Sequence, residues 1–160
     1  MKKIILVFAV TLTIAGSAFA TDTSTTTAAQ GTFPSGTSFS GVNLNGLQIA
    51  TATVLVSDGS AEGQVTVALM GTTALGVQQT INVDAVASGG SSTAANIVTI
   101  NGTCAIDLGD GTAPMTGVPF VATITLNANH QGTVGLVLGA TALPAATING
   151  GSMSIESLAD

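Results

Sequence analysis

Apolar side chains recur at every second position in several short stretches of this chain. The clearest stretch runs from Val118 to Leu126, and its apolar alternate positions are Val118, Phe120, Ala122, Ile124 and Leu126. A period of two residues places successive side chains on opposite faces of a β-strand. The ranges 63–70 and 77–86 alternate in the same way, and no stretch has the period of a convincing amphipathic helix. The chain is therefore predicted to be all-β.

Turn-forming dipeptides separate these stretches and indicate how the strands connect. Asn-Gly occurs at Asn45-Gly46, Asn101-Gly102 and Asn149-Gly150, and this dipeptide is a strong hairpin signal. Many short strands with such turns are typical of an antiparallel sandwich or barrel. We favour an antiparallel β-sandwich of about nine or ten short strands over residues 39–160, because the apolar faces are one-sided and the length suffices for two sheets. A parallel β-solenoid is the alternative, but it needs a fixed repeat, and none is found.

The first 38 residues are predicted to lie outside this domain. Two lysines, an apolar run over residues 4–14 and the small residues of Ala18-Phe19-Ala20 form a secretory signal peptide, residues 1–20. Residues 21–38 are rich in Thr and Ser with little apolar content, so we expect a flexible lead-in. The mature protein is therefore expected outside the cytoplasm, either extracellular or periplasmic.

The mature chain carries no basic side chain other than its single histidine. Lys2 and Lys3 are the only lysines or arginines, and their removal changes the formal net charge from −6 to −8. Affinity for nucleic acids and for anionic lipid head groups comes mainly from Lys and Arg. The expected partners therefore include neither nucleic acid nor membrane, and no membrane insertion follows signal cleavage. Schiff-base and Ser–Lys catalysis are excluded for the same reason.

The remaining residues form no recognisable catalytic pattern. His130 is the only histidine and lies in a polar turn, without partners that would make it a general base. No Gly-x-Ser-x-Gly nucleophile motif occurs. Paired carboxylates of a glycosidase are formally possible, but the mature chain has no Trp or Tyr to line a sugar site. We predict that the protein is not an enzyme, and we assign no catalytic, cofactor-binding or metal-binding residue and no cofactor.

Two local features remain open from the sequence. Asp107 and Asp110 lie in a Gly-rich turn whose carboxylates and carbonyl oxygens suit calcium, although Asp-Gly is also an ordinary turn dipeptide. Cys104 shares its alternate set with Ile106 and Leu108, which favours a small buried hydrophobic side chain. An intermolecular disulfide is the alternative, whereas a single cysteine excludes an intramolecular one.

Three segments weakly resemble uncharacterised bacterial secreted β-sandwich domains of surface proteins. These segments are AANIVTING at 94–102, GVPF at 117–120, and LPAAT through GSMSI over 143–155. The resemblance implies a secreted structural module and transfers no catalytic residue.

Together these observations predict a secreted, non-enzymatic structural or interaction domain of a bacterial envelope or extracellular surface. Its expected partner is a second copy of the chain or another surface protein. Self-association would use a sheet face or strand edges, which here carry no Lys to block pairing. The alternative is a ligand-binding module for calcium or a cell-surface glycan.

Overall fold

The computed structural model describes residues 21–129 and 131–158, and these residues form β-strands without a helix. The predicted signal peptide, residues 1–20, and His130 lie outside the described residues. Every strand pairing is antiparallel, so the all-β antiparallel prediction is confirmed and a parallel solenoid is excluded. The strands are β1 (Asp22–Thr32), β2 (Ser38–Phe39), β3 (Val42–Leu55), β4 (Ala61–Thr73), β5 (Gln78–Ala94), β6 (Ile97–Asp107), β7 (Met115–Leu126), β8 (Gly132–Leu138) and β9 (Thr141–Leu158).

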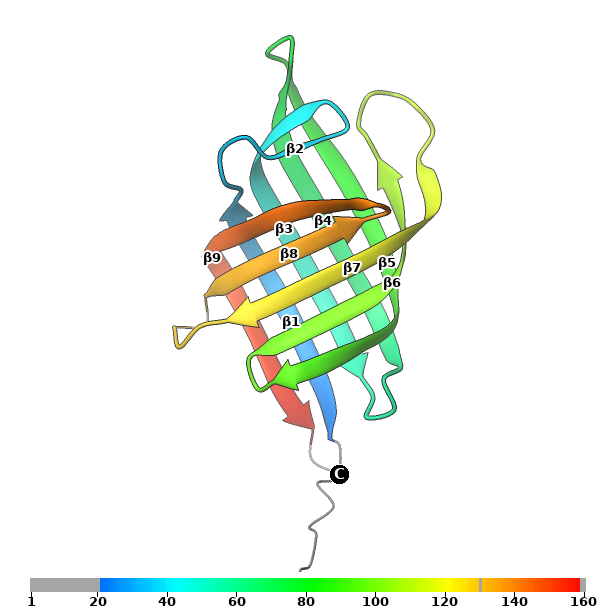
Figure 1. Ribbon diagram of the computed structural model, residues 1–160, viewed down its shortest axis with the longest axis vertical. Coiled ribbons are helices and arrows are strands. Elements are labelled where there is room, and N and C mark those ends of the chain that lie inside the picture. Colours follow the sequence, from blue (N-terminus) through cyan, green and yellow to red (C-terminus); the bar gives the residue numbers. More distant parts are fainter. Residues whose placement is uncertain (1–20, 130, 159–160) are drawn as a thin grey trace, which may run out of the picture.

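The prediction of a sandwich is wrong, because the sheet closes into a barrel. Strands β3 to β9 pair in chain order, and β1 pairs with both β9 and β3. Eight strands thus form a continuous ring, with the short β2 paired only to β3. Figure 1 shows the result as two layers, in which β6, β7 and β8 cross in front of β1, β3 and β4. Closure gives each of the eight strands two neighbours, whereas a sandwich leaves edges on both sheets.

Long strands that bend from one layer into the other explain why the sandwich prediction failed. Strand β9 has 18 residues; it begins beside β8 in the front layer and ends beside β1 in the back layer (Figure 1). The predicted turn at Asn149-Gly150 lies inside this strand, opposite the shift of register between Gln30 and Gly31. Gly151 there has φ 87°, and a Cβ atom would collide with the carbonyl oxygen of Ala28. This Gly pair therefore bends one strand at a β-bulge and does not connect two strands.

The other two Asn-Gly dipeptides also lie inside strands. Gly46 follows a register shift between β3 and β4, and Gly102 lies opposite the shift between Ala87 and Gly89 in β5. Residues 88–92, although they consist of Ser and Gly, continue β5 along β6. The Asn-Gly dipeptides do lie where regular strand pairing is interrupted, but these interruptions are β-bulges that curve a barrel and not hairpin turns.

The prediction of a flexible lead-in over residues 21–38 is also wrong. Strand β1 (Asp22–Thr32) closes the barrel, with Thr25 paired to Thr53 of β3 and to Ile155 of β9. Thr is β-branched and favours strands, but polar residues on both faces of this segment concealed the alternation. The side chains that point inward are Thr23, Thr25, Thr27 and Ala29.

The apolar side chains that alternate in the sequence fill the barrel interior. The alternate set of β7 is buried as predicted from Phe120 to Leu126, and Val118 is partly buried against it. Cys104 is also buried, with 4% of its surface exposed, which confirms the hydrophobic interpretation. The largest side chains with almost no exposure are Phe120, Leu47, Leu69, Ile81, Ile100, Ile106, Ile124, Leu136 and Met153.

A strip of five threonines interrupts this apolar interior between β1 and β3. Thr25 pairs with Thr53 and Thr27 with Thr51, whereas Thr23 pairs with Leu55, and each of the five threonines is at most 5% exposed. The Thr51 hydroxyl donates to the Thr25 carbonyl oxygen at 3.4 Å, whereas the Thr25 and Thr27 hydroxyls have no hydrogen-bond partner among the described residues. An unpaired buried hydroxyl costs about 1–3 kcal/mol of stability, so this strip is less stable than an apolar one.

We expect Thr27→Val to raise the free energy of unfolding by about 1 kcal/mol, because valine has nearly the same shape and leaves no unpaired hydroxyl. Urea denaturation measures the change. Thr51→Val is the matched control: it removes a hydroxyl that does have an acceptor, so its gain should be smaller or absent. A loss of stability in Thr27→Val would show that this hydroxyl is satisfied in solution.

Candidate functional site

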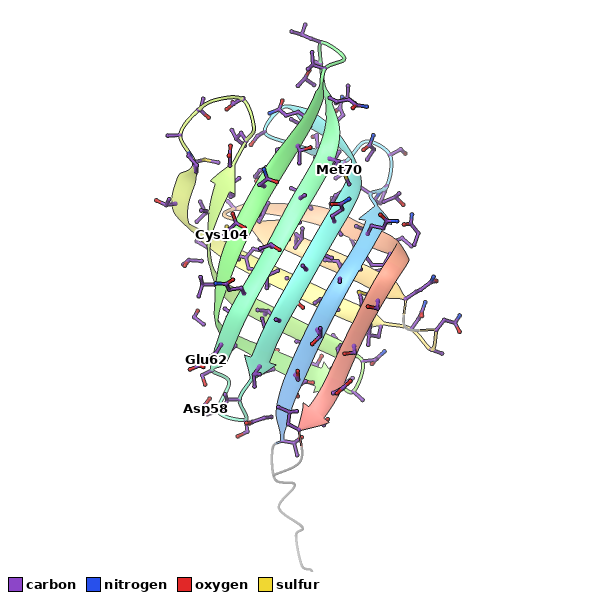
Figure 2. The ribbon with its side chains drawn as sticks, turned by 180° about the vertical axis from the view of Figure 1, so that it is seen from behind. Asp58, Glu62, Met70 and Cys104 are labelled. Atoms are coloured by element: carbon purple, nitrogen blue, oxygen red, sulfur yellow. The ribbon has the colours of Figure 1, made fainter. Side chains whose placement is uncertain are left out.

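A hollow of about 880 Å³ lies on the outer surface of the barrel. Its floor crosses β1, β3, β4 and β5, and it reaches β6 on one side and Gly151 of β9 on the other. Figure 2 shows this outer face, with Met70 toward one end of the strands and Asp58 and Glu62 at the other. We call this hollow the groove. Its volume falls within the range of about 300–1,000 Å³ that is typical of ligand sites.

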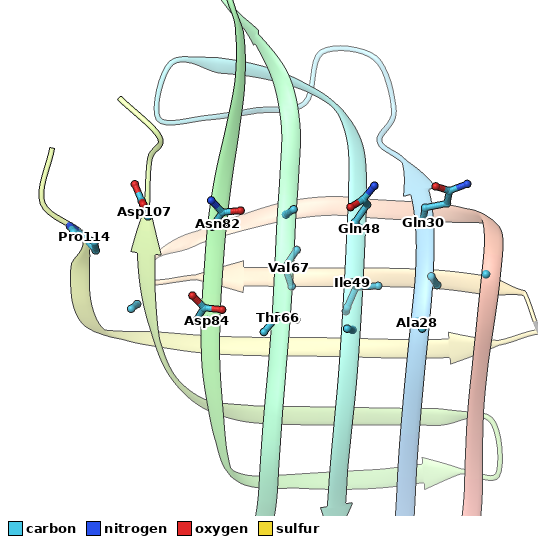
Figure 3. Close-up of a pocket in the computed structure, with 15 residues that line it drawn as sticks. Ala28, Gln30, Gln48, Ile49, Thr66, Val67, Asn82, Asp84, Asp107 and Pro114 are labelled. Atoms are coloured by element: carbon cyan, nitrogen blue, oxygen red, sulfur yellow. The ribbon is translucent and has the colours of Figure 1, made fainter. Parts of the chain in front are cut away.

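Strand register arranges the groove side chains in two rows. The first row is Gln30, Gln48, Ala68, Asn82 and Asp107, each paired with the next across neighbouring strands. Figure 3 shows Gln30, Gln48, Asn82 and Asp107 side by side along this row. The second row, two residues further along each strand, is Ala28, Ala50, Thr66, Asp84 and Ala105. Small side chains thus form the floor, and carboxamides and carboxylates rise from it.

Neighbouring segments form the two ends of the groove. At one end the chain between β6 and β7 brings Pro114 to the rim beside Asp107 (Figure 3). At the other end the Gln30 side chain lies over Gly150, where a Cβ atom would come within 2.8 Å of the Gln30 Nε2 atom. The glycine therefore gives Gln30 room to lie flat at the rim.

The groove carries negative charge without a compensating cation. Asp84 is exposed and Asp107 is half-buried, and neither lysine nor arginine occurs in residues 21–160. Phosphate, sulfate and carboxylate groups would therefore meet only carboxylates and amides here. The groove favours neutral or cationic ligands.

The turn that holds Asp107 and Asp110 donates hydrogen bonds to one oxygen of each carboxylate. Asp107 Oδ1 accepts a hydrogen bond from the Gly109 amide at 2.9 Å. Asp110 Oδ1 accepts from the backbone amide of Thr112 at 2.9 Å and from its hydroxyl at 2.6 Å. These hydrogen bonds from Thr112 hold the pKa of Asp110 below its usual value. No group of three or more His, Cys, Asp or Glu side chains suited to a metal ion lies within residues 21–129 and 131–158.

Asp58 and Cys104 do not line the groove. Asp58 repeats the pattern of Asp110, since the side chain and backbone of Ser60 donate to its Oδ1 and lower its pKa. Cys104 points into the core, where burial raises the pKa of its thiol, so it is unsuited to nucleophilic chemistry.

A second hollow of about 490 Å³ lies at the end of the barrel near Thr23, Leu55 and Ser157. The hairpin between β4 and β5 exposes Leu75 at its tip, 91% accessible.

Sequence reasoning did not identify the groove. Asn82 and Asp84 lie in the range 77–86, which was predicted only as a strand, and Asp107 was considered only as part of a turn. Gln30 lay in the predicted lead-in. The groove residues become neighbours only through the pairing of β1 with β3 and of β3 to β6 with one another. No local sequence pattern encodes the register of these pairings.

Within the described residues, no helix is long and apolar enough to cross a membrane. Comparisons with protein-family models, with curated proteins and with solved structures give no match to this chain. Any function must therefore be argued from the groove and the barrel themselves.

Proposed function

We propose that this chain is a secreted, non-enzymatic interaction domain whose partner docks in the groove. The groove is the observation that carries the proposal: it is a hollow of about 880 Å³ with a floor of small side chains and polar side chains along its length. Such a surface offers shape and hydrogen-bonding groups on rigid strands, which suits recognition.

Secretion is supported by the position of the fold relative to the predicted signal peptide. The first strand begins at Asp22, two residues after the expected cleavage site at Ala20. A barrel that needs β1 from its first residues is compatible with removal of residues 1–20 but not with removal of many more. The mature domain would work in the periplasm or outside the cell.

A binding role suits the groove better than hydrolysis does. A glycosidase needs one carboxylic acid whose surroundings keep it protonated. Asp84 is exposed to solvent, and Asp107 already accepts a hydrogen bond from the Gly109 amide.

The barrel changes the expected route to self-association. Strand-edge pairing needs unpaired backbone groups, and each of the eight barrel strands has two partner strands. Among the described strands only the two-residue β2 (Ser38–Phe39) has a single partner strand, and the two halves of β9 are each paired on one side, residues 141–147 with β8 and residues 147–158 with β1. Because few free edges are left, we expect a second copy to dock on a sheet face, and the groove is the recessed part of one.

The test is binding of fluorescently labelled mature protein to washed cells of the source organism. Ala50→Arg places a long side chain in the groove floor, and Ala142→Arg adds the same charge at an exposed position of β9 outside the groove. We expect Ala50→Arg to weaken binding about tenfold or more, equivalent to about 1.4 kcal/mol, and Ala142→Arg to bind as the parent does. Equal binding of both variants, or no binding by the parent protein, would contradict the proposal. Thermal melting confirms that both variants fold.

A further inference from the structure

We infer that the groove binds a neutral, hydroxyl-rich chain, that is, a glycan without charged groups. This inference rests on the proposed function and names its ligand class. It follows from the hydrogen-bonding groups, the charge and the shape of the groove.

The first row offers hydrogen-bond donors and acceptors to solvent. The exposed carboxamides of Gln30, Gln48 and Asn82 form no hydrogen bond within the described residues. Each carboxamide has two N–H donors and an oxygen acceptor. A sugar hydroxyl also donates and accepts, so adjacent hydroxyls can make paired hydrogen bonds to one carboxamide. A row of such groups therefore matches a ligand that presents hydroxyls along its length.

The carboxylates at one end of the groove further favour a ligand with uncharged hydroxyl groups. An ionised carboxylate only accepts hydrogen bonds, so Asp84 and the second oxygen of Asp107 would accept hydrogen bonds from ligand hydroxyls. They would also repel an acidic polysaccharide or a phosphorylated ligand, and no lysine or arginine in residues 21–160 offsets them. A cationic ligand would be attracted to this end, but it would leave the carboxamide acceptors and donors of Gln30 and Gln48 largely unused.

The floor suits a flat ring better than a peptide side chain. Ala28, Ala50 and Ala68 leave a shallow apolar surface without deep pockets, on which the C–H face of a sugar ring can rest. Peptides are typically bound to sheets by addition at an edge with pockets for alternate side chains, and the groove lies in the middle of paired strands. We therefore favour a glycan over a peptide.

The length of the first row indicates a chain of sugars as the ligand. From Gln30 to Asp107 the row crosses four inter-strand steps, β1 to β3, β4, β5 and β6. At about 4.8 Å a step the row extends about 19 Å, which exceeds one sugar unit. The mature chain has no Trp or Tyr, so the affinity would rest on hydrogen bonds without aromatic stacking and would be modest.

The experiment follows the side-chain amide NMR signals of Gln30, Gln48 and Asn82 during titration of the mature protein. The probes are cellohexaose, maltohexaose and chitohexaose as neutral chains, hexagalacturonate as an acidic chain, and a lysine-rich peptide as a cation. We expect at least one neutral hexasaccharide to shift these signals with saturation, and hexagalacturonate to leave them unchanged. Gln48→Ala should weaken that binding about fivefold, as for one lost hydrogen bond. Gln78→Ala removes an exposed carboxamide outside the groove and should have no effect.

The outcomes separate the ligand class from the proposed function. If no neutral hexasaccharide shifts the groove signals, or if Gln78→Ala weakens binding as much as Gln48→Ala, the glycan inference is wrong. Loss of cell binding in Ala50→Arg would still support an interaction domain in that case. A groove shift with the lysine-rich peptide alone would replace the glycan by a cationic partner. Cleavage of a hexasaccharide would overturn the non-enzymatic function itself.

Discussion

Removal of β1 is expected to abolish folding of the domain. A chain that begins at Phe33 lacks the strand that joins β3 to β9, so the barrel opens along its whole length. Both new edges would expose unpaired backbone groups, and the interior beside Ile49 and Met153 would reach solvent. The loss should equal the whole stability of a small domain, about 5–15 kcal/mol. Far-UV circular dichroism and the dispersion of NMR amide signals measure the outcome.

A circular permutant provides the matched control for this truncation. Asp22 pairs with Leu158, so the start of β1 lies beside the end of β9. A chain that begins at Phe33 and carries residues 21–32 after Asp160, through a short Gly/Ser linker, restores the strand in the same place. We expect the permutant to fold and the truncated chain to aggregate or remain unfolded. A truncated chain with native-like spectra would show that residues 21–32 are the flexible lead-in that their composition indicates.

The contrast between β7, which was predicted, and β1, which was not, shows which strands a local sequence pattern can reveal. Alternation of large apolar residues was sufficient to predict β7 and its buried face from Phe120 to Leu126. Strand β1 alternates too, but its inward residues are Thr and Ala, and its outward residues include Ser24 and Thr26. A periodicity signal needs a contrast in polarity between the two faces. Where both faces are small and polar, only pairing partners distant in the chain reveal the strand.

The choice between a barrel and a sandwich rests on a similar limit. Both folds contain antiparallel strands with one-sided apolar faces. They differ in whether the first and last strands meet, and here that depends on the pairing of β1 with β3 and β9. The Asn-Gly dipeptides added a second difficulty, because the same residues form a hairpin turn or a bulge according to their tertiary surroundings.

The groove was even less accessible to sequence reasoning than the fold. Its polar residues occupy outward positions that look like an ordinary solvated face in each strand taken alone. Gln48, Asn82 and Asp107 become neighbours only through the register of β3 to β6. What the sequence does establish is that no lysine or arginine after Lys3 can bind an anionic ligand, wherever the strands lie.

Phe120 is expected to be the most sensitive single side chain of the core. It is 1% exposed, and it pairs with Gly102 of β6 on one side and with Leu138 of β8 on the other. A Cβ atom at Gly102 would collide with the carbonyl oxygen of Val86, so glycine is required there for close approach of β5 and β6. The aromatic ring opposite the glycine fills space that no side chain of Gly102 can occupy, an arrangement that stabilises glycines in sheets.

We expect Phe120→Ala to lower the free energy of unfolding by about 3–5 kcal/mol, because it removes a large buried side chain and leaves a cavity beside Gly102. Urea denaturation with an unchanged m-value would measure this loss. Val121→Ala is the matched control on the same strand: Val121 points to the opposite face and is half-buried, so its loss should be about 1 kcal/mol or less. Equal losses in the two variants would mean that the inward and outward faces of β7 are assigned wrongly.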